Sequence, residues 1–467
     1  MTTTPSNAAG AAFDALQELS SAEKRATIRK VTLRLVPILA IAYFFNSLEK
    51  TNIGLAALQM NQSLGLTTAA FGLASGLLFV GYAVFEVPSN LIQYKVGARK
   101  WLARIMITWG ACAAATGFVN NEASLYILRI LLGVAEAGFY PGVILYFTLW
   151  VPKQYRGTML SLFVLGGTLS SVIGSPLTGL LLTPDHYFGI ESWRAMFVIE
   201  GIPAILVGVV CLFKLVDRPA EAKWLTGRER DWLESSIAAE HALVESNHSG
   251  KGVLRALGDI RVLMLSLIYF CLKCGQYALA FFLPLMIVAF QTQAGTKMST
   301  LQVSLMVAIP ALVAIAPAIL WARHSDRTGE RFWHATIPAI VGAIGICVSA
   351  VLHEPVLIMV AICFAMIGLT SQSAPFYQIP GFFLTGAAAA TAFGLINSLG
   401  NLGGFVAPTV FGALKDATGD YVAPSLLMGG FLIVAAVLTA LLPKMFKSLN
   451  PRQHAAAPEA QPLVAAK

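Results

Sequence analysis

The chain has 467 residues, of which 57% are apolar and 12% are charged, whereas a soluble globular domain carries about 25% charged residues. This balance is typical of a membrane protein and excludes an array of soluble domains. The net charge of +8 does not indicate nucleic-acid binding, because that function clusters basic residues on one soluble face. The six cysteines all lie in apolar stretches, where thiols act as small hydrophobic groups, so neither a disulfide framework nor a metal site is predicted.

Residues 1–34 precede the first apolar stretch. They lack the apolar core and cleavage site of a signal peptide, so we expect a cytoplasmic tail. Apolar stretches of about 20 residues, long enough to cross a bilayer as helix, then recur along the chain. We therefore predict an all-α integral membrane protein with twelve transmembrane helices, at 35–58, 71–93, 101–119, 124–150, 158–182, 194–216, 262–290, 302–322, 335–352, 356–381, 387–413 and 422–443.

The longest polar interruption, 217–261, divides the predicted helices into six and six. Its many charged residues predict a cytoplasmic linker with one surface helix. The expected domains are therefore a cytoplasmic tail at 1–34, a six-helix bundle at 35–216, the linker at 217–261, a second six-helix bundle at 262–443 and a cytoplasmic tail at 444–467.

Lysine and arginine are distributed unequally between the two sides of the predicted helices. Short basic loops stay in the cytoplasm, and one side carries only Arg194, Lys297 and Lys415. We therefore expect both termini to be cytoplasmic. The cytoplasmic side carries the basic residues of the linker together with Lys24, Arg25, Arg29, Lys30, Arg34, Lys95, Arg99, Lys100, Arg104, Lys153, Arg156, Arg323, Arg327, Arg331, Lys444, Lys447, Arg452 and Lys467.

A short pattern repeats in the second cytoplasmic loop of each half, at 90–99 and at 322–331. Basic, glycine and basic residues recur there at the same spacing. The glycine permits a tight turn, and the basic side chains can bind the exposed carbonyls at helix ends. The pattern is either a loop that acts in conformational change or a set of positive-inside anchors. The residues concerned are Gly97, Arg99, Asp326, Arg327, Gly329 and Arg331.

Four charged residues interrupt the predicted transmembrane helices of the first half. Glu49 and Lys50 lie in the first helix, and Arg129 and Glu136 lie in the fourth. Intramembrane charges are costly and mark functional sites by default. Because seven residues make about two helical turns, Arg129 and Glu136 share one face, about 10 Å apart along the axis, and can line one cavity.

Two interpretations of these charges remain open. They could neutralise one another in a buried ion-pair network that holds two helices together. Alternatively, Lys50 and Arg129 bind an anion, since arginine suits bidentate contact with a carboxylate. Glu49 and Glu136 would then carry protons, because desolvation favours the neutral acid whereas nearby cations favour the carboxylate.

Several segments carry a family resemblance, namely 43–56, 81–90, 128–141, 323–331 and 397–405. Together with the repeated loop, they resemble the major facilitator superfamily and, within it, the anion:cation symporter family. The resemblance runs from about residue 29 to residue 443. It implies two six-helix halves with inverted repeats around a site near the membrane midplane. It also implies import of organic anions, such as sugar acids, tartrate, phthalate and other aromatic carboxylates, usually together with protons.

The resemblance implies roles for individual residues. Arg129 and Glu136 match the arginine and glutamate of the family's fourth helix, which implies substrate binding and proton coupling. Glu49 and Lys50 stand where an aspartate-arginine pair is commoner, so the division of labour between Glu49 and Glu136 stays open. In the first repeated loop, Tyr94 stands where an aspartate is typical, which puts a charge-relay role for that loop in doubt.

Other intramembrane polar residues are weaker candidates for the site. Lys273 either binds substrate or extends its ammonium toward the interface, and Glu86 and Glu200 suit structural pairing better than proton transfer. Asparagines on membrane helices also join helices by hydrogen bonds, and a tyrosine is as suited to a helix contact as to a ligand. With these alternatives open, the candidate substrate-binding residues beyond Lys50 and Arg129 are Tyr82, Gln276, Tyr277, Asn397 and Asn401.

We expect a proton-coupled symporter that imports a small organic carboxylate by alternating access, with protons as the coupling ion and no other cofactor. The alternatives are an anion uniporter or exchanger, or a membrane sensor without net transport. Ser47 and Lys50 match an acyl-transfer motif only by letter, so no enzyme is expected. The expected setting is a monomer in a bacterial inner membrane. The identity of the anion and the coupling stoichiometry stay open.

Overall fold

The computed structural model describes residues 19–246, 258–384 and 386–446 of the chain. Parts of three expected segments lie outside the described residues. These are 1–18 of the N-terminal tail, 247–257 of the linker and 447–467 of the C-terminal tail, including Lys447, Arg452 and Lys467.

Helices account for nearly all secondary structure in the first half and the linker. One π-helical turn, η1, interrupts a helix, and one two-stranded antiparallel hairpin pairs His186 with Glu191. The elements are α2 (Ser21–Leu64), α3 (Thr68–Val96), α4 (Ala98–Thr116), α5 (Glu122–Glu136), α6 (Phe139–Thr148), α7 (Lys153–Leu169), η1 (Ser170–Gly174), α8 (Ser175–Leu181), β1 (His186–Tyr187), β2 (Ile190–Glu191), α9 (Ser192–Lys214), η2 (Pro219–Glu221) and α10 (Gly227–Ser246).

The second half is helical throughout its described residues. Two of its predicted spans are divided, one at Gln372 and one at Leu402. The elements are α12 (Ile260–Gln293), α13 (Thr300–Thr328), α14 (Phe332–Val351), α15 (Pro355–Ser371), α16 (Ser373–Gln378), η3 (Ile379–Phe382), α17 (Gly386–Asn401), α18 (Gly403–Thr418) and α19 (Val422–Met445).

Each predicted span coincides with helix, and the predicted all-α membrane fold is confirmed. Within the described residues, 10 helices are long and apolar enough to cross a membrane. Two predicted spans fall outside this set for local reasons. The helix α4 carries Arg99, Lys100 and Arg104 near its start, and the span 387–413 is divided between α17 and α18, each of 16 residues. The domain boundaries between the bundles stay predictions.

Helix ends follow local sequence signals. The side chain of Ser20 caps α2, and Glu23 completes a capping box, which satisfies backbone N–H groups that have no partner within the helix. Ser299 and Gln302 do the same for α13. The helices α2 and α13 end at Gly65 and Gly329, whose φ angles of 64° and 68° are readily adopted only by glycine.

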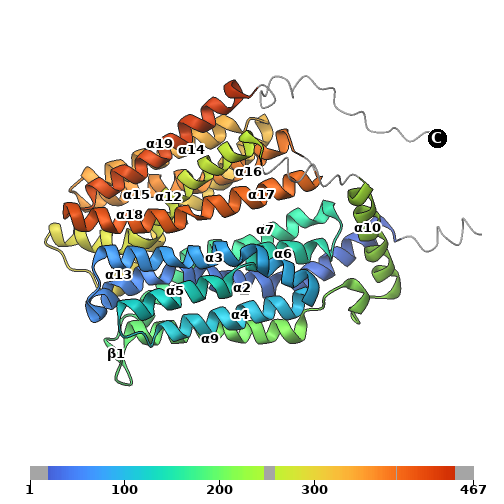
Figure 1. Cartoon of the computed structure of the whole chain (residues 1–467), viewed down its shortest axis with the longest axis horizontal. Helices are drawn as coiled ribbons and strands as arrows, with labels where there is room; N and C mark the ends of the chain where they lie inside the picture. Colours follow the sequence, from blue (N-terminus) through green and yellow to red (C-terminus); the bar gives the residue numbers. More distant parts are fainter. Residues whose placement is uncertain (1–18, 247–257, 385, 447–467) are drawn as a thin grey trace, which may run out of the picture.

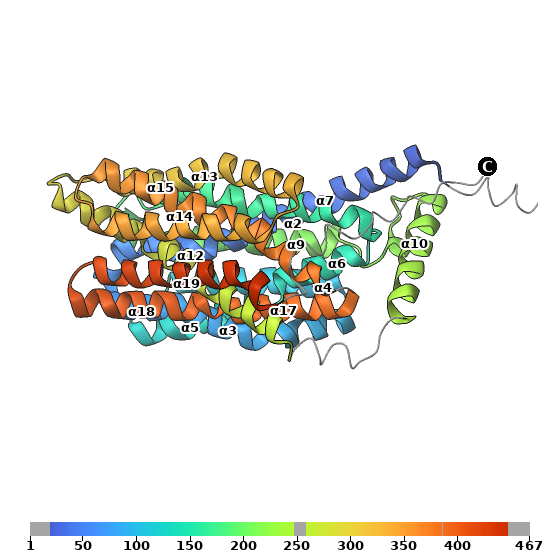
Figure 2. The ribbon, with the colours of Figure 1, turned by 90° about the horizontal axis from the view of Figure 1, so that it is seen from above.

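The two halves lie side by side with their helices along the long axis of the molecule (Figure 1). The helix α10 lies across one end, and the β1–β2 hairpin lies at the other. Figure 2 shows α10 running across the direction of the bundle helices. Ion pairs connect α10 to the first half, since Lys30 Nζ lies 2.9 Å from Glu229 Oε2 and Arg156 Nη1 lies 2.7 Å from Glu240 Oε1. The described part of the expected linker therefore covers one end of the first bundle.

The halves are tightly packed at the hairpin end. A Cβ atom on Gly72 of α3 would lie 3.0 Å from the carbonyl carbon of Pro408 on α18, and a Cβ atom on Gly54 of α2 would lie 2.8 Å from the carbonyl oxygen of Phe281 on α12. Such close backbone approach requires small residues. Toward the α10 end the two groups of helices diverge in Figure 1. The molecule is therefore closed at the hairpin end.

Candidate substrate and proton site

A break between α5 and α6 positions Glu136. The helix α5 ends at Glu136, and the chain turns at Gly138, whose φ is 87°. A Cβ atom at Gly138 would lie 2.7 Å from the Cβ of Ser89, so glycine is required there for its dihedral angle and for space. The break leaves the Glu136 carboxylate at a helix C-terminus in mid-span, where the helix dipole disfavours negative charge.

Lys50 compensates this unfavourable position. Its Nζ forms an ion pair with Glu136 Oε1 and donates a hydrogen bond to Asn46 Oδ1 over 3.2 Å. The same ammonium lies 5.2 Å from the centre of the Tyr82 ring, within range of a cation–π interaction. The side chain of Lys50 is 22% exposed and that of Glu136 is 4% exposed. The pair therefore borders accessible space on the lysine side only.

Glu49 points away from its neighbour Lys50. It is 3% exposed, and neither carboxylate oxygen has a hydrogen-bond partner among the described residues. Glu200 of α9 interacts electrostatically with it, while Glu200 itself accepts hydrogen bonds from Asn52 Nδ2 over 2.7 Å and Thr178 Oγ1 over 2.6 Å. Glu49 is therefore a buried acid without an ion-pair partner among the described residues, with the Trp109 side chain beside it, whereas Glu200 is held by hydrogen bonds.

Arg129, which was predicted to line a cavity with Glu136, is instead completely buried. Its Nε donates a hydrogen bond to the carbonyl oxygen of Ala74 over 3.2 Å. Nη1 and Nη2 have no hydrogen-bond partner within the part of the chain that the structure describes. Arg129 interacts electrostatically with Glu136, but it does not border accessible space in this conformation.

The candidates from the second half lie near one another but have different partners. Gln276 Oε1 accepts a hydrogen bond from Lys273 Nζ over 2.7 Å, and the Tyr277 hydroxyl donates one to Asn401 Oδ1 over 3.4 Å. Asn397 Nδ2 instead donates to Glu86 Oε1 of the first half over 3.4 Å. Asn397 therefore contributes to a contact between the halves.

Several residues beside this site were not identified from the sequence. Asn46 lies one helical turn before Lys50, and Tyr269 lies one turn before Lys273, so the spacing of helix neighbours could have indicated both. The hydroxyls of Tyr269 and Tyr377 are hydrogen-bonded to each other, and no sequence signal connects these two positions. Tyr377 also lines a cavity of about 450 Å³ toward the α10 end, together with Gly329, Arg331, Gln378, Gly381, Phe382 and Phe393.

The first repeated loop is held by a residue far away in sequence. The backbone N–H of Arg99 donates a hydrogen bond to Asp217 Oδ1 over 2.7 Å. A Cβ atom at Gly97, whose φ is 95°, would lie 3.0 Å from the same carboxylate. Asp217, just after α9, therefore provides a carboxylate in this loop, where Tyr94 occupies the position that is typically aspartate.

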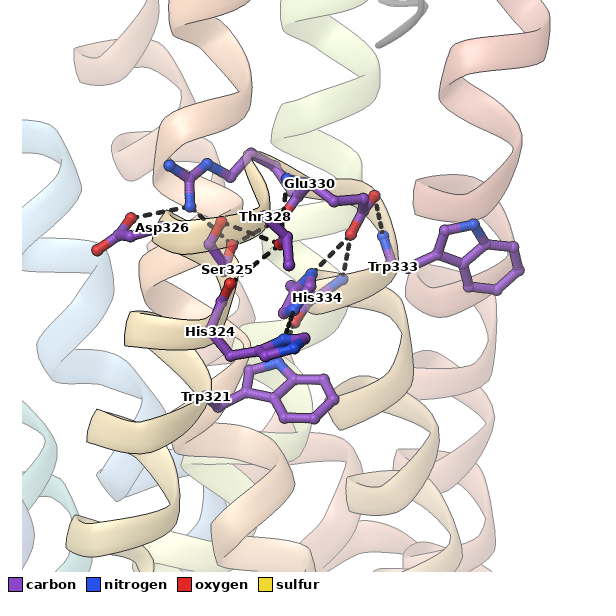
Figure 3. Close-up of polar contacts among 9 residues, drawn as sticks. Trp321, His324, Ser325, Asp326, Thr328, Glu330, Trp333 and His334 are labelled. Atoms are coloured by element: carbon purple, nitrogen blue, oxygen red, sulfur yellow. Dashed lines mark hydrogen bonds and ion pairs between the residues drawn. The ribbon is translucent and has the colours of Figure 1, made fainter.

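The second repeated loop is closed by its own residues (Figure 3). Arg331 Nη1 lies 2.8 Å from Asp326 Oδ1 and 2.7 Å from Ser325 Oγ. Nearby, His334 lies between His324 and Glu330 (Figure 3), with its Nε2 2.7 Å from His324 Nδ1 and its Nδ1 2.7 Å from Glu330 Oε2. Gly329 forms the left-handed end of α13, and Arg327 lies in the last turn of α13, exposed.

A bundle of membrane-spanning helices with ionisable side chains in mid-span defines a polytopic membrane protein with a functional site inside it. The chain belongs to the Major Facilitator Superfamily, whose family model matches residues 39–408. The superfamily membership indicated by the sequence is therefore confirmed.

The chain is similar over nearly its whole length to proteins that are described as transporters. A protein of Agrobacterium vitis named "Putative tartrate transporter" is 43% identical over 432 residues, covering 91% of this chain and 94% of that protein. "Putative metabolite transport protein NicT" of Pseudomonas putida is 40% identical over 422 residues, covering 90% and 95%. These relatives agree with the resemblance to organic-anion permeases of the superfamily.

The fold is similar to a crystal structure of a bacterial homolog to the human lysosomal transporter Spinster, in an inward-facing and unoccupied conformation. The TM-score is 0.73 at 16% sequence identity, and the match covers 91% of this chain and 98% of that chain. The similarity concerns the fold alone.

Proposed function

We propose that this protein imports a small organic carboxylate together with protons by alternating access. The ion pair between Lys50 and Glu136 carries the proposal. Lys50 is the more exposed member of the pair, so an incoming carboxylate meets the lysine and competes with Glu136 for it. Protonation of Glu136 removes this competition. Anion binding and proton uptake then favour each other, which is the thermodynamic requirement for coupled transport.

Glu49 is the second candidate proton carrier. An ionised carboxylate that is buried without a partner is costly, so the empty carrier favours the neutral acid at this position. Arg129 contributes positive charge behind Glu136, and its unpartnered Nη groups are available to a carboxylate once the helices move. Tyr82 lies beside Lys50, and Gln276, Tyr277 and Asn401 supply polar groups from the second half.

The closed hairpin end supports an inward-facing state. With the positive-inside orientation, both termini and α10 are cytoplasmic, and the hairpin end faces outward. Bacterial relatives support a location in a bacterial inner membrane. The two repeated loops lie at the cytoplasmic end in this orientation, where Asp217 and Arg331 hold them against their own halves and allow each half to move as one body.

Uptake by purified protein in liposomes tests the proposal. Radiolabelled hydroxy, sugar and aromatic carboxylates are offered with and without an inward proton gradient, and accumulation of one of them under the gradient is expected. A pH difference of one unit across the membrane supplies about 1.4 kcal/mol for each coupled proton. If a variant loses one coupled proton, its accumulation ratio should therefore fall by up to about tenfold for each unit of pH difference. We expect this loss in Glu136→Gln or Glu49→Gln.

Glu354→Gln is the matched control, because Glu354 is an exposed carboxylate at the start of α15. This variant should leave the gradient dependence of uptake unchanged. Gradient-driven accumulation that survives in both glutamine variants would exclude the proton assignment. Uptake by the unmodified protein that is independent of the proton gradient would indicate a uniporter or an exchanger.

A further inference from the structure

Lys273 of α12 is the only lysine or arginine within the predicted spans of the second half. Its Nζ donates a hydrogen bond to Gln276 Oε1 over 2.7 Å and lies 5.1 Å and 5.3 Å from the ring centres of Tyr269 and Tyr277. Among the described residues, no carboxylate lies within 4.0 Å of this ammonium. The ammonium is therefore contacted by uncharged polar and aromatic groups, and no negative charge balances it at this distance.

Lys273 and Lys50 lie on the same side of the contact that closes the molecule. The helices α2 and α12 meet where Gly54 approaches Phe281, and both helices run from the α10 end toward this contact. Lys50 precedes Gly54 by four residues and Lys273 precedes Phe281 by eight, which correspond to about 6 Å and about 12 Å along the helices. Both ammonium groups therefore lie on the α10 side of the closed end, one on each half.

Aromatic side chains connect the two lysines across the boundary between the halves. Lys50 lies over the Tyr82 ring, and Phe79, one turn away on α3, packs against Tyr277 with ring centres 4.4 Å apart. Tyr277 in turn lies beside Lys273. The start of α18 fits closely against this group, because a Cβ atom at Gly403 would lie 3.1 Å from the Cβ of Lys273 and one at Gly404 would lie 2.7 Å from the Phe79 ring.

The two ammonium groups interact electrostatically, and this repulsion between like charges is unfavourable away from bulk water. Glu136 neutralises Lys50, whereas Lys273 has no such partner in the described residues. Protonation of Glu136 removes the ion-pair partner of Lys50, which also interacts electrostatically with Glu86. The site then presents two cations from opposite halves, and a ligand with two negative charges satisfies both.

We propose that Lys273 binds the second carboxylate of a dicarboxylate substrate whose first carboxylate is bound by Lys50. This inference rests on the proposed function, since it assumes that the anion enters at Lys50. A dianion that contacts both lysines would connect the two halves during the conformational change, whereas a monocarboxylate would leave one lysine uncompensated.

Two matched probes test the inference. Tartrate carries two carboxylates, and glycerate, a hydroxy acid of similar polarity, carries one. The full-length protein is reconstituted in liposomes, and uptake of both acids is measured for the unmodified protein and for Lys273→Gln. Because a hydrogen bond to a charged group stabilises by about 1.5–3 kcal/mol, tartrate uptake at limiting concentration should fall about tenfold to a hundredfold, while glycerate uptake changes little.

Lys273→Arg and Lys444→Gln are the companion variants. The arginine variant keeps the charge and should keep most of the preference for tartrate. Lys444 is an exposed cation in the last turn of α19, and its removal should affect neither acid. Size-exclusion profiles and melting temperatures of the variants in detergent report whether Lys273→Gln folds.

A tartrate-to-glycerate ratio that is unchanged in Lys273→Gln would overturn the inference, and so would an equal loss of both acids in a folded variant. Equilibrium binding of tartrate and glycerate to the detergent-solubilised protein separates this inference from the proposed function. If the unmodified protein moves neither acid but Lys273→Gln loses tartrate binding selectively, proton-coupled transport is wrong and the role of Lys273 stands.

Discussion

The carboxylate of Asp416, near the end of α18, accepts a hydrogen bond from the backbone N–H of Ala69, at the start of α3, over 2.7 Å. The two residues belong to different halves and lie at the closed hairpin end. The carboxylate adds to the cap that Thr67 provides for α3 and lies where the helix dipole favours negative charge. This contact stabilises the state in which the hairpin end is closed.

Asp416→Ala should shift the protein toward states in which the hairpin end is open. Loss of a capping side chain costs about 1 kcal/mol, so the ratio of closed to open molecules should fall about fivefold. Spin labels at Asn121 and Asp420, both exposed at this end, would report a larger population of long distances. An unchanged distance distribution would show that helix packing alone holds this end closed.

The same contact should be insensitive to pH over the neutral range. Burial raises the pKa of the Asp416 carboxyl, but hydrogen bonds from the Ala69 N–H and from Thr67 and Thr68 lower it by more. The pKa therefore lies below the usual range of an aspartate. The closed state therefore stabilises the ionised form. This stabilisation is complete above about pH 5 and is lost as the pH falls through the lowered pKa.

The spin-label distances should thus stay constant between about pH 8 and about pH 5 and change only in stronger acid. Asp416→Asn provides the comparison, because it cannot ionise. A transition between about pH 5 and about pH 8 that persists in this variant would assign the pH dependence to another group.

Gly138→Ala should destabilise the protein and displace Glu136. The positive φ of 87° and the close approach of Ser89 together cost about 1–3 kcal/mol when a methyl group is added. A lower melting temperature in detergent and weaker gradient-driven uptake are expected. Gly157→Ala is the matched control, because Gly157 lies in α7 with no neighbouring atom within 4 Å of the added Cβ; equal destabilisation of both variants would contradict this assignment.

Arg331→Ala should slow transport without weakening substrate binding. The change removes the contacts of Arg331 with Ser325 and Asp326, which lie at the end of α13 and not beside Lys50. We expect the maximal uptake rate to fall about twofold to tenfold, the equivalent of one or two hydrogen bonds, at an unchanged half-saturation concentration. Arg323→Ala removes an exposed charge from the same helix end; a matching loss in this control would indicate a general effect of positive charge.

The apolar spans alone predict the all-α membrane fold and show which charged residues lie within it. Apolar stretches of about 20 residues indicate membrane spans, because a helix satisfies its backbone hydrogen bonds within the bilayer. Each such stretch can be recognised from neighbouring residues alone. The positions of Glu49, Lys50, Arg129 and Glu136 within the spans followed directly. Internal spacing also paired the two repeated loops.

The pairing of the charged groups becomes visible only in the folded molecule. Lys50 pairs with Glu136 of another helix, while its neighbour Glu49 is buried on a different face. Asp217 reaches Gly97 and Arg99 across more than 100 residues, and Asp416 joins the halves at one end. Such pairings depend on the rotation of each helix about its axis and on which end of the bundle is closed. Neither quantity leaves a periodic pattern in the sequence, because both are fixed by packing between distant segments.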